Sequence, residues 1–165
     1  MNTPIADFLR NYTAAGVSRM HMPGHKGKGL LGCEPLDITE VAGADALYEA
    51  DGIIARSEAN ATELFGSGRT VYSVEGSSQC IRAMLYLALI HRKQGASRTI
   101  LAARNVHKAF VYAAALLDFE IVWLWPERHA SLCACPVTAE GVERALREMA
   151  QPPAAVYLTS PDYLG

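Results

Sequence analysis

The feature that most constrains the fold is an alternation, along the second half of the chain, of short apolar runs with segments of helical period. The runs that predict strands are residues 70–74, 99–103, 119–125 and 155–159. The segments between them that predict helices are residues 77–89, 109–117 and 139–149. Strands that alternate with helices connect by right-handed parallel crossovers and place ligands beyond their carboxyl ends. The sequence therefore predicts an α/β fold with a mostly parallel sheet.

The turn Gly76-Ser77-Ser78 lies between the first apolar run and its helix. A helix that begins at Ser77 or Ser78 leaves its first amide N–H groups without backbone partners and places the positive end of its dipole there. Such a turn can hold an anion, for example a phosphate, with two hydroxyl groups beside it. The alternative is an ordinary serine N-cap, which suits Ser77 equally well.

The beginning of the chain is less regular. Residues 3–15 place apolar side chains on one stripe, which predicts a short amphipathic helix. Residues 21–29 are too rich in Gly and Pro for a regular element, and residues 36–52 are acidic and rich in turn residues. Helical spacing returns at residue 53. We therefore expect a helix and arm segment over residues 1–52, followed by an incomplete α/β domain over residues 53–165.

No metal site or disulfide is expected. His21 and His25 lie in an irregular segment without a nearby cluster of carboxylates or thiolates, so they are poor candidates for metal ligands. The cysteines are Cys33, Cys80, Cys133 and Cys135. Cys133 and Cys135 do not have the two-residue spacing of zinc ribbons or thioredoxin-like motifs, so reduced thiols are the better interpretation.

Charge and apolar patterning limit the classes of partner. The net charge is −2 with both signs interspersed, which predicts neither nucleic-acid binding nor a basic membrane-binding patch. The N-terminus lacks the pattern of a signal peptide, and the apolar stretches are too short to span a membrane. These observations predict a cytoplasmic protein.

Several segments, taken in order, resemble the major domain of the ornithine/lysine/arginine decarboxylases. The matching segments are Met22 to Lys26, Asp37 to Glu40, Gly43 to Asp45, Gly76 to Ser78, Arg104-Asn105 with His107-Lys108, and Thr159 to Pro161 with Tyr163 and Gly165. Each segment alone is weak, but their order and spacing make the combination fairly specific. The resemblance implies a partial three-layer αβα large domain of the aspartate-aminotransferase type, with pyridoxal 5'-phosphate as cofactor.

The same resemblance assigns roles to individual residues. In such enzymes the turn after the first large-domain strand binds the cofactor phosphate, which implies that role for Gly76, Ser77 and Ser78. His107 matches the residue that stacks on the pyridine ring, and Ser160 lies on the strand end that approaches the cofactor. By themselves, His107 is also compatible with a surface histidine at a helix start and Ser160 with a turn residue. Ala109 replaces a hydroxyl residue that family members often have.

The resemblance also implies that catalytic residues are missing. The family's Schiff-base lysine and the acidic partner of the pyridinium nitrogen both fall beyond Gly165. Lys108 imitates part of the lysine motif, but its position matches the ring-stacking segment, so we assign no catalytic residue. In the family's sheet order, the strand near Val71 pairs with strands that come later. We therefore expect an inactive fragment with exposed apolar strand edges.

Two functions remain open at this stage. The first is the N-terminal part of a pyridoxal-phosphate-dependent decarboxylase of basic amino acids, whose full-length parent is a homodimer or higher oligomer. The second is a noncatalytic α/β module that binds a phosphorylated small molecule or complements a separately encoded second half. The sequence does not choose among lysine, arginine and ornithine as substrate.

Overall fold

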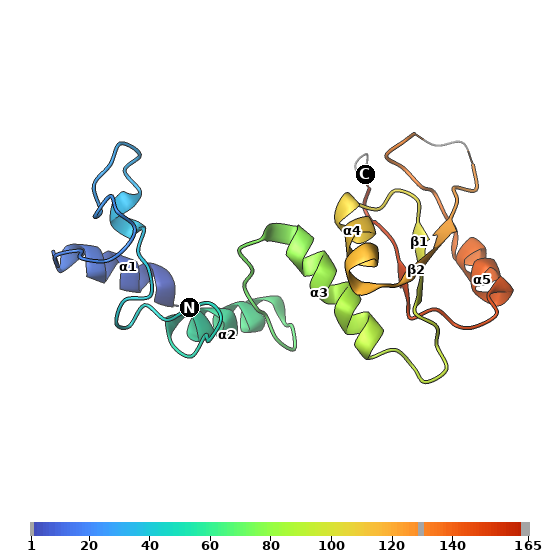
Figure 1. The fold of residues 1–165 in the computed structure, drawn as a ribbon, viewed down its shortest axis with the longest axis horizontal. Helices are drawn as coiled ribbons and strands as arrows, with labels where there is room; N and C mark the ends of the chain where they lie inside the picture. Colours follow the sequence, from blue (N-terminus) through green and yellow to red (C-terminus); the bar gives the residue numbers. More distant parts are fainter. Residues whose placement is uncertain (1, 129–130, 163–165) are drawn as a thin grey trace. The chain divides into compact units, whose positions relative to one another are not determined.

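The computed structural model describes residues 2–128 and 131–162 of the chain (Figure 1). The chain forms two compact units, Met1–Tyr72 and Ser73–Gly165.

The first unit contains helices α1 (Pro4–Ala14) and α2 (Ile53–Phe65) and the short 3₁₀ helix η1 (Glu34–Leu36). α1 packs against both α2 and η1. At the start of α1, the amide and the hydroxyl group of Thr3 both donate to the Asp7 carboxylate at 3.0 Å, so an acidic side chain in the first turn satisfies donors next to the helix start. The end of α2 is set by Gly66, which has a φ of 60°. Both predicted helices of this unit are confirmed.

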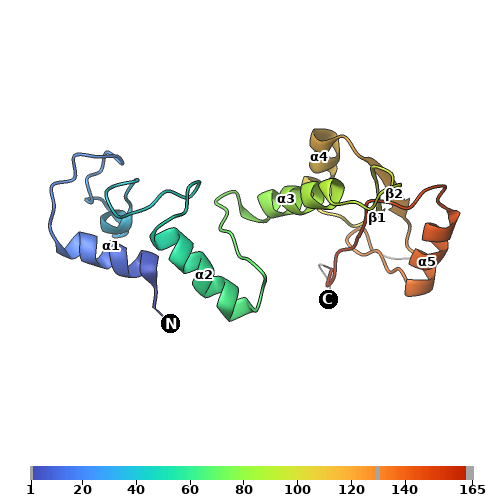
Figure 2. The same cartoon turned by 90° about the horizontal axis from the view of Figure 1, so that it is seen from below.

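The second unit alternates helices and strands. In chain order it contains α3 (Gly76–Ile90), β1 (Thr99–Ala103), α4 (Lys108–Leu117), β2 (Glu120–Leu124), α5 (Ala139–Glu148) and β3 (Ala155–Tyr157). The strands form one parallel sheet in the order β2-β1-β3. Figure 2 shows α4 and α5 on opposite sides of this sheet, which gives three layers. The predicted α/β fold class is confirmed.

The core of the second unit lies where α3 and α4 meet the sheet. Ile100 and Ala102 of β1 are fully buried and pack with Leu85 of α3 and Phe110 of α4. All five residues of β1 are buried, as expected of a central parallel strand whose two neighbours and two faces are covered. The continuous apolar run that predicted this strand therefore has a physical cause in its position.

The predicted strand over residues 70–74 is wrong for the described part of the chain. This segment has no strand partner there, and the backbone N–H groups of Thr70 and Tyr72 donate to side chains of α2 instead. High β-propensity does not produce a strand without a neighbouring strand to complete the ladder. Two smaller corrections concern strand ends, because β2 ends at Leu124 and β3 ends at Tyr157.

The boundary between the compact units lies between Tyr72 and Ser73. α2, which the sequence grouped with the α/β domain, belongs to the first unit and packs against α1. The predicted division into an arm segment (1–52) and an incomplete large domain (53–165) describes domains of the family rather than contacts within this chain. It therefore stays a prediction. Within the described residues, none of the helices has the length and apolar character needed to cross a membrane.

Candidate functional site

The first turn of α3 is open to an anion. The helix begins at Gly76, one residue before the predicted start, and Gly76 has a φ of 64°. Its N-cap residue, Glu75, makes no capping hydrogen bond through its side chain, and a Cβ atom at Gly76 would meet nothing within 4 Å. Among residues 2–128 and 131–162, the hydroxyl groups of Ser77 and Ser78 have no hydrogen-bond partner. The first amides of this helix and two hydroxyl groups are thus available to one ligand.

The charges beside this turn are compatible with an anion. The Glu75 carboxylate is paired with the Arg82 guanidinium, which also donates to the Gln79 side chain at 2.7 Å. Because the charge of Glu75 is balanced by Arg82, this carboxylate does not cancel the positive end of the α3 dipole at the turn.

The next two helices are capped by side chains, unlike α3. His107 is the N-cap of α4, and its Nδ1 atom accepts the Ala109 amide at 3.1 Å. Thr138 caps α5 in the same way by accepting the Gly141 amide at 3.0 Å. Because Nδ1 of His107 is an acceptor, the proton of the neutral ring lies on Nε2. The cap fixes the imidazole ring of His107 at the start of α4.

Asn105 is a further candidate residue, to which the sequence assigned no role. It follows β1 directly after Arg104, its Nδ2 atom donates to the Cys133 carbonyl at 3.4 Å, and its Oδ1 atom is buried without a hydrogen-bond partner in the described part of the chain. A buried carbonyl oxygen without a donor is costly, and a ligand that donates a hydrogen bond removes this cost. An amide side chain two residues after a mostly apolar strand was the feature in the sequence that could have pointed to it.

Ser160 is exposed and follows β3 by three residues. β1 and β3 pair in parallel, with Leu101 opposite Val156, so the chain segments that carry His107 and Ser160 leave the sheet at the same edge. The later turns of α3 pack on the sheet through Leu85 and Leu89, and in Figures 1 and 2 the first turn is the end of the helix that lies away from the sheet. No hydrogen bond between described residues joins the α3 turn, His107 and Ser160. Tyr163 and Gly165, which contributed to the resemblance, lie outside the described residues.

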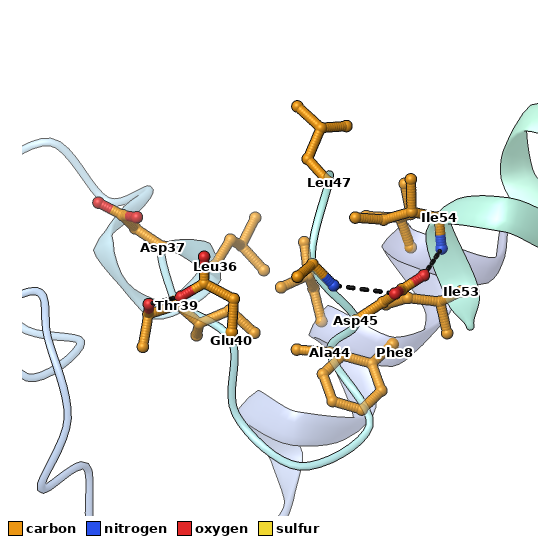
Figure 3. Close-up of a pocket in the computed structure, with 14 residues that line it drawn as sticks. Phe8, Leu36, Asp37, Thr39, Glu40, Ala44, Asp45, Leu47, Ile53 and Ile54 are labelled. Carbon is orange, nitrogen blue, oxygen red and sulfur yellow. Dashed lines mark hydrogen bonds between the residues drawn. The ribbon is translucent and has the colours of Figure 1, made fainter. Parts of the chain in front are cut away.

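The first unit contains a separate pocket of about 300 Å³ between α1, η1 and the start of α2 (Figure 3). Its walls combine apolar side chains such as Phe8 with three carboxylates. Each carboxylate already has a partner: Asp37 pairs with His25 at 3.2 Å, Glu40 with the Thr39 hydroxyl group, and Asp45 with backbone amides. The pocket is therefore a place where the elements of the first unit pack against one another, rather than a cation site.

Asp45 accepts the hydrogen bonds that hold the loop beside this pocket. Its two carboxylate oxygens accept backbone N–H groups at 2.8 to 3.2 Å, and dashed lines in Figure 3 mark two of these bonds. The donors are Ala46, Asp51, Gly52 and Ile54. Desolvation favours the neutral acid, but the four amides together outweigh it and lower the pKa of Asp45 to about 2. Asp45 thus fixes the loop that leads into α2.

The described residues contain no cluster of three or more His, Cys, Asp or Glu side chains that could hold a metal ion. Both ring nitrogens of His21 are in hydrogen bonds, to Tyr12 at 2.7 Å and to the Met22 carbonyl at 2.5 Å. Both ring nitrogens of His25 are also used, by Asp37 and by the Gly27 amide. The cysteines are free thiols.

Comparison with known proteins identifies the family. The sequence profile of the Orn/Lys/Arg decarboxylase major domain matches residues 3–165. The arginine decarboxylases of Bacillus subtilis and Halalkalibacterium halodurans are 29% and 31% identical to this chain, and each alignment covers 99% of this chain and 34% of the relative. This chain belongs to the Orn/Lys/Arg decarboxylase family, and it spans about a third of the length of these relatives.

The fold agrees with this assignment. The constitutive lysine decarboxylase of E. coli superposes with a TM-score of 0.65 at 22% identity, over 93% of this chain and 24% of that protein. Lysine decarboxylase A from Pseudomonas aeruginosa gives a TM-score of 0.62 over 87% of this chain and 21% of that protein. The predicted family and the predicted partial αβα architecture are both confirmed.

Proposed function

We propose that this chain supplies the phosphate-binding and ring-holding side of a pyridoxal 5'-phosphate site in a decarboxylase of basic amino acids. The observation that carries the proposal is the open first turn of α3, with two unpaired serine hydroxyl groups, in a chain of this family. When bound, the cofactor supplies a ring that accepts the electrons left by departing carbon dioxide. The residues of this chain bind and orient that ring.

The proposed roles follow from the donors and acceptors present. The amides of the α3 turn and the hydroxyl groups of Ser77 and Ser78 bind the phosphate. The capped imidazole of His107 packs against the flat ring, and the buried Oδ1 atom of Asn105 accepts a hydrogen bond from the bound ligand. Ser160 contributes a hydroxyl group at the same edge of the sheet. A donor-rich turn, a fixed aromatic ring and an unpaired acceptor fit a phosphorylated heteroaromatic cofactor.

No residue of this chain is proposed as the catalytic lysine. Lys108 is the first residue of α4 and is exposed. Because it is exposed, its side chain is open to solvent at the surface of the helix. Replacement of Lys108 by Ala is expected to leave the visible absorbance of added cofactor unchanged. A visible band that is present in the wild-type chain and lost in Lys108→Ala contradicts this assignment.

The phosphate turn is tested by comparing pyridoxal phosphate with pyridoxal. The expected result is tighter binding of the phosphorylated form, measured by tryptophan fluorescence or equilibrium dialysis. Ser78→Ala removes one hydrogen bond to a charged group, so the dissociation constant is expected to rise about tenfold. Ser131→Ala, on the loop before α5, is the matched control and leaves the constant unchanged. Equal binding of both forms by the wild-type chain contradicts the proposal.

The second candidate function is complementation of a separately encoded part. The observation that favours it is the exposed apolar surface of α3 and α4 in the second unit. The side chains that are about half or more exposed there are Met84, Tyr86, Leu87, Ile90, Tyr112 and Leu116. Co-expression with a polypeptide that spans the remaining length of a curated relative tests it. Restored amino-acid decarboxylation supports a split enzyme, whereas cofactor binding without complementation favours a binding module.

A further inference from the structure

A second pocket of the first unit, of about 320 Å³, lies between α2 and the chain that folds back along this helix. Two backbone amides fix the returning chain: the Thr70 amide donates to Thr62 Oγ1 and the Tyr72 amide donates to Glu58 Oε1, both at 2.8 Å. The walls come from α2, from Ala50 before the helix and from residues 68–70 after it. Its volume is that of a site for a small molecule.

The hydroxyl groups that line this pocket are already engaged within the unit. The Thr62 hydroxyl group donates to the Glu58 carbonyl at 2.8 Å, in addition to accepting the Thr70 amide. The Thr70 hydroxyl group lies 2.9 Å from Ser67 Oγ. The polar side chains of the lining that remain to recognise a ligand are therefore Glu58 and Arg69.

Glu58 is a buried carboxylate without a cationic partner. The residue is only 7% exposed, and its Oε1 atom accepts one neutral donor, the Tyr72 amide. Among residues 2–128 and 131–162, no hydrogen bond or ion pair reaches its Oε2 atom, and none involves the Arg69 guanidinium. A buried charge without a partner is costly, and a ligand that brings a positive charge removes this cost. In the pocket beside α1, by contrast, each carboxylate has a partner.

We propose that this pocket binds a zwitterionic amino acid with an aliphatic side chain. The α-ammonium group donates to Glu58 Oε2, and the α-carboxylate accepts from the Arg69 guanidinium. Because Glu58 and Arg69 form no direct ion pair, both charges are available to one ligand. The methyl groups of Ala50, Ala55 and Ala59 offer an aliphatic side chain an apolar wall and offer a polar one no partner.

The charge balance of the pocket separates this ligand from a basic amino acid. The carboxylate and the guanidinium of the lining cancel, so a ligand whose own charges cancel leaves no charge unpaired. A second ammonium or guanidinium group on the ligand would have no acceptor among the alanines. The site lies wholly within the first unit and does not depend on the cofactor role proposed above.

L-Leucine is the probe, and two analogues that each lack one of its charges are the matched comparisons. Isothermal titration calorimetry of the full chain measures the dissociation constants, and the NMR signals of the Thr70 and Tyr72 amides report where the probe binds. L-Leucine is expected to bind about tenfold more tightly than isoamylamine, which lacks the carboxylate, and than isocaproate, which lacks the ammonium group. L-Lysine is expected to bind about tenfold more weakly than L-leucine.

Two substitutions test the two charges separately. Glu58→Gln keeps an oxygen for the Tyr72 amide but removes the charge, so it is expected to weaken L-leucine binding about tenfold and to leave isocaproate binding unchanged. Arg69→Gln, at an exposed position, is expected to weaken L-leucine binding about fivefold. Arg56→Gln is the matched control and binds as the wild-type chain does, because Arg56 is an exposed residue of α2 outside the pocket lining.

Arg69→Gln also covers the case in which Glu58→Gln does not fold, because the Arg69 side chain is exposed. A wild-type chain that does not bind L-leucine, or that binds isoamylamine equally well, overturns the proposal. L-Leucine binding that shifts neither the Thr70 nor the Tyr72 amide signal, or that Arg69→Gln leaves at the wild-type affinity, overturns it as well.

Discussion

In the second unit, the fully buried side chains are apolar and come from adjacent helices and strands, such as Ile100 of β1 and Phe110 of α4. In the first unit, the side chains that fix the loops are carboxylates and hydroxyl groups that accept backbone amides, such as Asp45, Glu58 and Thr62. Apolar packing is non-directional and depends on volume, whereas side-chain to backbone hydrogen bonds depend on the position and the charge of single atoms. The two units should therefore respond to different perturbations.

Loss of volume in the second unit should have the largest effect. Phe110 is fully buried and lies 5.6 Å from the Phe119 ring and 4.6 Å from the Tyr157 ring, centroid to centroid. Phe110→Ala is expected to lower the free energy of unfolding by about 3–5 kcal/mol because it removes buried apolar surface and leaves a cavity. Chemical denaturation followed by circular dichroism measures this change. Tyr112→Ala, on the exposed side of the same helix, is the control, and an equal loss there would contradict the difference between core and surface.

Neutralisation of Asp45 should affect the first unit selectively. Since the pKa of Asp45 is lowered in the folded state from its ordinary 3.8 to about 2, its contribution to stability is complete above about pH 4 and is lost as the pH falls toward 2. The exchange protection of the Gly52 and Ile54 amides should therefore fall over this range. Asp45→Asn should show the lower protection already at pH 7. Asp51→Asn, in the same loop, is the control and should behave as the wild-type chain. If the exchange protection of these amides in Asp45→Asn still falls between pH 4 and pH 2, a group other than Asp45 causes the effect.

The smallest expected effect concerns a polar contact on the surface of the second unit. The Arg104 guanidinium lies 4.9 Å from the centroid of the Trp123 ring and 5.6 Å from that of Trp125. Arg104→Gln is expected to lower the free energy of unfolding by about 0.5–1 kcal/mol, the usual range for an exposed cation–π contact. Denaturation curves followed by tryptophan fluorescence would measure it, with Arg128→Gln as the control. A loss above 2 kcal/mol would mean that this contact contributes to stability as a core residue does, which contradicts its description as a surface contact.

The sequence predicted the regular part of the second unit well because its signals are local. β1 was predicted with its observed bounds, since a fully buried parallel strand is a continuous apolar run. The helix predicted over residues 139–149 is observed as α5, Ala139–Glu148. The start of α3 was predicted to within one residue, which placed the serines of the candidate site at the helix end.

What the sequence could not predict depends on partners that are distant or irregular. Residues 70–74 have strand propensity, but whether they form a strand depends on a neighbour that no local pattern reveals. The role of Asp45 depends on four amides in an irregular loop and on its own positive φ of 67°. Likewise, nothing local marks Glu58 as an acceptor for Tyr72, because a Glu on a helix usually faces water.

The cysteines provide a consequence of a different kind. Cys135 is buried, and its Sγ atom lies 3.4 Å from the Arg104 amide and 3.5 Å from the Leu124 carbonyl, whereas Cys33, Cys80 and Cys133 are exposed. A thiol-reactive reagent should therefore label three positions quickly and the fourth only when the loop before α5 lifts from the ends of β1 and β2. The labelling rate of Cys135 would therefore measure how often the sheet edge opens at which the cofactor is proposed to bind.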